Sequence, residues 1–136
     1  MAQIEITYEG DLATRCVHSE NKAEILTDAP KENKGQGRVF SPTDLFAASL
    51  GSCMLTLMGI AAKGLQIDIQ GMRATVSKEM TSVPSRRISK LCVAFSCPHR
   101  FSDEVTAKLI HAAEHCPVHH SLHPDIVLEF TYSWGT

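Results

Sequence analysis

The sequence predicts an α+β domain in which strands, a long apolar helix, further strands, two helices and a last strand follow one another. Three patterns carry this prediction. Residues 45–62 contain no formally charged side chain, residues 126–134 alternate between apolar and polar side chains, and Ser41 and Ser102 are suited to begin helices. The 136 residues are enough for one domain, and we expect residues 1–136 to form a single domain.

The N-terminal residues predict strands. Residues 3–8 place Ile4, Ile6 and Tyr8 on one face, which is the period-two pattern of a strand. Two short strands and a loop follow, at residues 15–18, 23–27 and 28–37.

A long helix has a clear predicted start. Ser41 suits the N-cap, Pro42 suits the first helical position, and Asp44 stands where an acidic side chain completes a capping box. The helix should end near Lys63, which is followed by Gly64.

The uncharged run at residues 45–62 is close to the length of a membrane-spanning helix. It contains serine, glycine and threonine, and amphipathic segments flank it, so we predict instead a helix that is buried on all faces. A chain of this size has little material to surround such a helix. We therefore expect a homodimer with the helix near its interface, and no membrane partner.

The second half of the sequence predicts strands and two helices. The expected strands are residues 67–69, 73–80, 88–96 and 126–134. Ser102 should cap a helix that runs to about His115, and Cys116 should cap a short helix that Pro117 opens.

Charge and cysteine content narrow the class of protein. The formal net charge is −2, which gives no reason to expect a nucleic-acid partner. The first residues show no basic region followed by an apolar stretch, so we expect a cytoplasmic protein. The five cysteines are scattered and odd in number, and a reducing compartment would keep them as free thiols.

Two cysteines are candidates for chemistry. Cys116 should begin a helix, where free backbone N–H groups favour a thiolate and lower the thiol pKa. Cys53 lies within the long helix and would need a cation or a hydrogen-bond donor supplied by the fold. The alternative for each is a small buried hydrophobic residue. Only tertiary structure can bring the two thiols within disulfide distance.

Histidines gather in residues 111–123. His111 and His115 lie one helical turn apart, and three more follow at His119, His120 and His123. Nitrogen ligands at such spacing can bind zinc. The alternative is a solvated helix end, where histidine suits the helix dipole. No ordered Cys-x-x-Cys and His-x-x-x-His pattern is present, and we predict no metal and no cofactor.

The motifs around both cysteines resemble those of one family. The segment Ser41-Pro42-Thr43-Asp44-Leu45 precedes the helix that carries Cys53, and Cys116-Pro117-Val118 precedes paired histidines. Both resemble motifs of the OsmC/organic hydroperoxide resistance superfamily, and the resemblance covers nearly the whole chain in order. It implies an intertwined α+β homodimer with long central buried helices and flanking antiparallel sheets.

The resemblance also implies an activity. Similar cysteines in characterised members reduce organic or inorganic hydroperoxides, so Cys53 would attack the peroxide and Cys116 would resolve the product as a disulfide. An external dithiol would restore both thiols. The family usually supplies an arginine held by a glutamate directly after the proline that opens the helix, where this chain has Thr43. Arg15 and Asp44 are the candidates for these two supporting roles, and the chain is more similar to the less characterised OsmC-like branch.

Two other functions stay open from the sequence. A protein of this fold could hold a small apolar ligand in a pocket at the dimer interface without catalysing a reaction. The histidine-rich segment 111–123 could instead serve to buffer metal.

Overall fold

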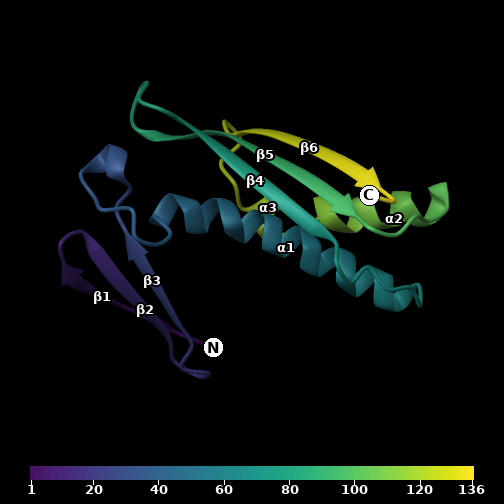
Figure 1. Cartoon of the computed structure of the whole chain (residues 1–136), viewed down its shortest axis with the longest axis horizontal. Coiled ribbons are helices and arrows are strands. Elements are labelled where there is room, and N and C mark those ends of the chain that lie inside the picture. Colours follow the sequence, from purple (N-terminus) through teal and green to yellow (C-terminus); the bar gives the residue numbers. More distant parts are fainter. The chain divides into compact units, whose positions relative to one another are not determined.

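The computed structural model describes residues 1–136, and the chain divides into two compact units, Met1–Phe46 and Ala47–Thr136 (Figure 1). The N-terminal unit holds one sheet and the start of helix α1. The C-terminal unit holds the rest of α1, a second sheet and two more helices. This arrangement of two three-stranded sheets and one long helix is α+β, as predicted.

The N-terminal sheet consists of three antiparallel strands in the order β1-β2-β3. Their bounds are Ile4–Gly10, Ala13–His18 and Glu24–Asp28, and a short 3-10 helix, η1, follows at Lys31–Asn33. Gly10, Asp11 and Leu12 all have positive φ, and they form the tight turn between β1 and β2. The predicted strands are confirmed, but the apolar face of β1 is exposed within this chain.

Helix α1 spans Pro42–Gly64 and begins as predicted. The backbone N–H of Ser41 donates to Asp44 Oδ2 at 3.0 Å, and the Asp44 N–H donates to Ser41 Oγ at 3.1 Å, which closes a capping box. By length and composition alone α1 could cross a membrane, but a core helix of a globular protein meets the same criterion.

The prediction that α1 is buried on all faces is wrong for a single chain. One face is buried, formed by Ala47, Leu50, Gly51, Met54, Met58 and Ala62. Ile60, on another side of the helix, is 61% exposed. Within the C-terminal unit, one sheet and two helices pack against α1, and they cover one side of it.

The C-terminal sheet has the order β4-β5-β6, with strands at Arg73–Thr81, Arg87–Cys97 and Val127–Trp134. Strand β4 pairs antiparallel with β5, whereas β5 and β6 are parallel, so the expectation of purely antiparallel sheets is wrong for this sheet. The chain leaves β5 and passes through α2 (Asp103–Glu114) and α3 (Pro117–His120) before it returns as β6. Such a long crossover is what lets two strands of one sheet run in the same direction.

Residues 67–69 do not form the predicted strand. The Ile67 N–H donates back to the carbonyl of Ala62 at 3.0 Å, and the Met72 N–H donates to the carbonyl of Ile69 at 2.9 Å. These turn hydrogen bonds use backbone groups that a strand would need for its neighbours.

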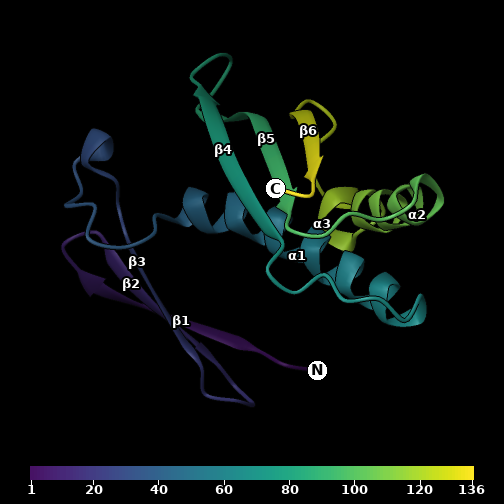
Figure 2. The same cartoon turned by 45° about the vertical axis from the view of Figure 1, so that its right-hand side comes forward.

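The core of the C-terminal unit lies between one face of its sheet and the helices (Figure 2). Leu91, Val93 and Phe95 of β5 point into it, as their alternation predicts, and are at most 2% exposed. Helix α1 packs closely against β4 at Gly51, where an added Cβ would lie 2.8 Å from a methyl group of Val76. That close approach fixes the segment of α1 that carries Cys53 against the sheet.

Candidate functional site

Cys53 and Cys116 meet in the C-terminal unit. Helix α1 brings Cys53 to the core, and the turn between α2 and α3 brings Cys116. Cys116 is 0% exposed, whereas Cys53 packs half-buried against the edge of the same apolar cluster. Cys53 lies close enough to Cys116 to raise the pKa of the Cys116 thiol. The fold thus joins two free thiols that lie far apart in the sequence.

The electrostatics of Cys116 differ from the prediction. Cys116 caps α3 as expected, and its Sγ accepts a hydrogen bond from the His119 backbone N–H at 3.3 Å. Nevertheless its pKa is raised: burial is the largest cause, the His119 N–H acts in the opposite direction, and the interaction with Cys53 raises the pKa further. The predicted lowering is wrong because α3 has only 4 residues, too few for a strong dipole, and the thiol is taken out of water.

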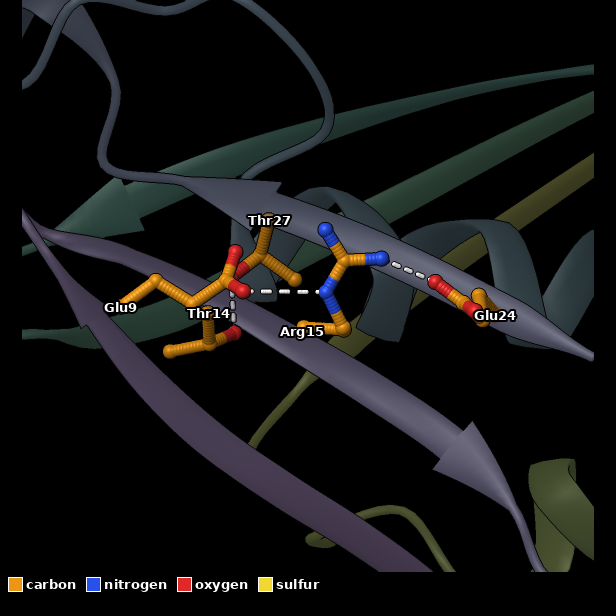
Figure 3. A network of polar contacts seen from close by, with 5 residues as sticks. All are labelled: Glu9, Thr14, Arg15, Glu24 and Thr27. Carbon is orange, nitrogen blue, oxygen red and sulfur yellow. Dashed lines mark hydrogen bonds and ion pairs between the residues drawn. The ribbon is translucent and has the colours of Figure 1, made fainter.

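Arg15, the predicted supporting cation, lies on β2 in the N-terminal unit. Figure 3 shows its guanidinium between two carboxylates of the neighbouring strands. Arg15 Nε donates to Glu9 Oε2 at 2.9 Å, and Nη1 donates to Glu24. Hydrogen bonding to Glu9, and then to Glu24, raises the pKa of Arg15, so the side chain is a fixed cation.

Asp44, the predicted carboxylate, lies in the first turn of α1. Its Oδ2 accepts the Ser41 N–H, so the structure gives Asp44 the capping role that the sequence also suggested. A carboxylate at this end of a helix is additionally favoured by the helix dipole.

The N-terminal unit contains a second arginine–carboxylate pair that the sequence interpretation missed. Asp28 is 1% exposed, and its Oδ2 accepts from Arg38 Nε at 2.8 Å and from the Arg38 backbone N–H at 3.0 Å. The side-chain hydrogen bond from Arg38 is the main reason that the pKa of Asp28 is lowered. The Asp28 backbone N–H donates to Phe40 at 3.1 Å, so the pair pins both ends of the loop that leads into α1.

The histidine cluster holds no preformed metal site. The rings of His111 and His115 stack with centroids 4.0 Å apart, and the His120 ring lies 5.7 Å from that of His115. No group of three or more His, Cys, Asp or Glu side chains is arranged to hold a metal ion. The other three cysteines lie outside the Cys53–Cys116 pair, and the Cys92 thiol donates to Glu129 at 3.5 Å.

Comparison with known proteins decides the family. The OsmC-like protein family matches residues 35–131. The chain belongs to the OsmC-like family. No curated protein matches it.

Solved OsmC-like structures agree with this assignment. A Psychrobacter arcticus protein, provisionally named for osmotic stress induction and a detoxification response, is 43% identical, with a TM-score of 0.92 over 97% of this chain and 96% of that one. An OsmC-like protein from Mycoplasma pneumoniae (15% identity, TM-score 0.82, 100% and 98% covered) and an organic hydroperoxide resistance protein OsmC from Legionella pneumophila (16%, 0.78, 98% and 96%) share the fold.

In this OsmC-like chain, polar contacts that the sequence interpretation did not single out gather at Glu114, two residues before Cys116. The Tyr132 hydroxyl of β6 donates to Glu114 Oε2 at 2.8 Å, and the ring of His119 donates from Nδ1 to the Glu114 carbonyl. One signal could have revealed the first contact: Tyr132 lies on the inward face of β6, where a hydroxyl needs a partner.

Proposed function

We propose that this OsmC-like protein reduces organic or inorganic hydroperoxides with Cys53 as the peroxidatic thiol and Cys116 as the resolving thiol. The observation that supports the proposal most is the proximity of these two thiols: both belong to one apolar cluster of the C-terminal unit, and Cys53 raises the pKa of Cys116. Organic hydroperoxide resistance proteins share the fold, which is consistent with the same chemistry.

The different environments of the two thiols support the division of roles. Cys53 is half-buried and so remains within reach of a small substrate, whereas Cys116 is fully enclosed. Because burial raises its pKa, Cys116 stays protonated at neutral pH and is a poor first nucleophile. Cys116 would act in the second step, in which it loses its proton and replaces the hydroxyl group on the Cys53 sulfur.

The proposed reaction has three steps. The Cys53 thiolate attacks one peroxide oxygen, the O–O bond breaks, and Cys53 becomes a sulfenic acid while the alkoxide takes up a proton and leaves as an alcohol. Cys116 then loses its proton and forms an S–S bond with Cys53, and the hydroxyl group of the sulfenic acid leaves as water. An external dithiol reduces the disulfide and is itself oxidised.

We propose Arg15 as the cation that supports Cys53 during the first step, and Asp44, at the start of the helix that carries Cys53, as the candidate supporting carboxylate. Arg15 is fixed by Glu9 and Glu24, so its charge would be held in one place. Arg15→Ala should slow the reaction of Cys53 with peroxide by about tenfold to a hundredfold, because a charged donor to the leaving oxygen is lost. An unchanged rate would remove Arg15 from the mechanism.

We propose that the protein works as a homodimer in the cytoplasm. Ile4, Ile6 and Tyr8 form an apolar row on β1 that is 63–65% exposed. In the C-terminal unit, Ile60 of α1 is 61% exposed. An exposed apolar row such as that on β1 is typical of an association site. The odd number and scattered positions of the five cysteines are consistent with a reducing compartment.

Rapid mixing tests the proposed activity. Reduced protein, held anaerobically, receives one equivalent of cumene hydroperoxide or of hydrogen peroxide, and free thiols are counted over time. We expect fast loss of two thiols per chain and a higher rate with one of the two peroxides. Oxidation no faster than that of free cysteine would contradict a peroxidase and favour a non-catalytic ligand-binding protein.

A further inference from the structure

A hydrogen bond between Glu114 and Tyr132 attaches the turn that carries Cys116 to the sheet. Glu114 is the last residue of α2, two positions before Cys116, and its Oε2 accepts the Tyr132 hydroxyl at 2.8 Å. The Tyr132 ring stacks on Phe95 with centroids 4.9 Å apart and planes within 4°, and Phe95 is 2% exposed. The contact therefore ties the end of α2 to a rigid part of the core.

The backbone of Glu114 continues this connection to the sulfur of Cys116. The Glu114 carbonyl can only accept, so the His119 ring donates to it from Nδ1. The backbone N–H of the same His119 donates to Cys116 Sγ at 3.3 Å, and the His119 ring meets Phe130 edge-on with centroids 5.7 Å apart. One residue, Glu114, thus anchors both the end of α2 and the residue that contacts the thiol.

Glu114 occupies a position in α2 that is unfavourable for an acidic side chain. An acidic side chain in the last turn of a helix is opposed by the helix dipole, and this one is half-buried. The Tyr132 hydroxyl offsets part of that cost. Burial, and then the contact with Glu114, raises the pKa of Tyr132, so the hydroxyl remains a donor at neutral and mildly alkaline pH. A residue that breaks a local rule but has a specific partner is a candidate for function.

We propose that Glu114 and Tyr132 are positioning residues for the resolving thiol, which they keep beside Cys53 by holding the α2–α3 turn against β6. The expected effect on the rate of disulfide formation rests on the proposed function. In the step affected, Cys116 loses its proton, the Cys116–Cys53 S–S bond forms, the S–O bond of the Cys53 sulfenic acid breaks, and water leaves. Neither residue contacts the reacting atoms, so both act through the placement of Cys116.

An equilibrium with glutathione tests the placement without any peroxide. The protein is equilibrated in defined ratios of reduced to oxidised glutathione, and mass spectrometry measures the fraction with a Cys53–Cys116 disulfide. We expect Tyr132→Phe and Glu114→Ala to lower the effective concentration of the thiol pair by about tenfold, since each removes a hydrogen bond to a charged group. Glu114→Gln, which keeps an acceptor for Tyr132, should restore it to within about twofold.

The matched control is Glu129→Gln. Glu129 also lies on β6 and also accepts a hydrogen bond, but from Lys90 and Cys92 on the face of the sheet away from the thiols. The Glu129→Gln variant should leave the equilibrium with glutathione unchanged. Equal values for wild type, Tyr132→Phe and Glu114→Ala would overturn the positioning role. If Tyr132→Phe fails to fold, the Glu114→Ala and Glu114→Gln pair tests the same contact from its other side.

Peroxide kinetics separate the positioning role from general damage. In Tyr132→Phe the oxidation of Cys53 should proceed within about twofold of wild type, whereas the Cys53 sulfenic acid should survive about tenfold longer and be trapped by dimedone. Slowing of both steps together would indicate a merely structural role and overturn the proposal. If wild-type protein does not react with peroxide, only the proposed function is overturned. The glutathione equilibrium would still test whether Glu114 and Tyr132 place Cys116 beside Cys53.

Discussion

The two units of this chain bury opposite kinds of side chain. Every buried hydrophobic residue lies at Ala47 or beyond, in the C-terminal unit, where the two thiols also meet. The buried residues of the N-terminal unit are polar: Thr27, Asp28 and Ser41. Its large apolar side chains, such as Ile6 at 65%, are exposed. The C-terminal unit therefore contains its own core and its own candidate chemistry, whereas the N-terminal unit presents an apolar surface and a charged pair.

The largest expected effect concerns the candidate chemistry of the C-terminal unit, which is tested by removing one thiol at a time. Cys53→Ser should slow the reaction with peroxide by about 10³-fold or more, because the nucleophile is gone. Cys116→Ser should keep the first step and accumulate a sulfenic acid that excess peroxide over-oxidises to a sulfinic acid. Stopped-flow kinetics and intact mass measure both. Similar losses in the two variants would contradict the assigned roles.

The exposed face of β1 should matter for association. Ile6→Glu places a charge in the proposed interface and should weaken the dimer by about a hundredfold, because an unpaired charge is costly to bury. Glu5→Gln, on the other face of the same strand, is the matched control and should leave the dimer intact. Sedimentation equilibrium gives both dissociation constants. If wild type is already a monomer at micromolar concentration, the proposed homodimer is refuted.

Asp28 in the N-terminal unit and Cys116 in the C-terminal unit should respond to opposite ends of the pH scale. The folded pKa of Asp28 lies below its ordinary value of 3.8, so its contribution is present above that pH and is lost as pH falls through the folded pKa. The folded pKa of Cys116 lies above the ordinary 9.0, so stability that is present below pH 9 is lost as pH rises towards the folded value.

Denaturant titrations across pH check this division. Arg38→Ala should remove the part of the acid-dependent change that comes from Asp28, because Arg38 is what lowers the Asp28 pKa. Cys116→Ala should reduce the alkaline change, to which Tyr132 also contributes, and should leave the acid change intact. Because the pKa of Cys116 is raised above its ordinary 9.0, disulfide formation should keep accelerating as pH rises from neutrality to beyond 9.0, and a rate independent of pH over that range would disprove this.

The smallest expected effect is at the start of α1. Asp44→Ala should lower the free energy of unfolding by about 1 kcal/mol, since it breaks one hydrogen bond of the capping box. Thermal denaturation measures this loss. If peroxide turnover falls at unchanged stability, Asp44 has a part in catalysis beyond capping.

Local sequence patterns predicted the helices and strands. Features that depend on tertiary packing could not be predicted from these patterns. The alternation in β6, the cap at Ser41 and the stop at Gly64 are local, and the structure follows them. The direction of β6 against β5 depends on the crossover through α2 and α3. The raised pKa of Cys116 depends on how deeply the fold encloses it, which the capping position alone does not reveal.

The candidate site also contains residues that the sequence predicted and contacts that only the structure reveals. The thiols Cys53 and Cys116 were predicted from their motifs, and the fold brings them together. The Glu114–Tyr132 contact joins a helix end to a strand and has no signature at any fixed spacing. The same holds for Asp28 and Arg38, whose pairing follows from the path of a loop that the sequence marks only by its composition.

Cys53 and Cys116 are proposed to form one redox pair, and a disulfide map tests this pairing most directly. Reduced protein is treated with one equivalent of hydroperoxide, alkylated and digested, and the linked peptides are sequenced by mass spectrometry. We expect a single disulfide that joins Cys53 to Cys116 within one chain. A link between Cys92 and Cys97, or oxidation spread evenly over the five cysteines, would contradict it.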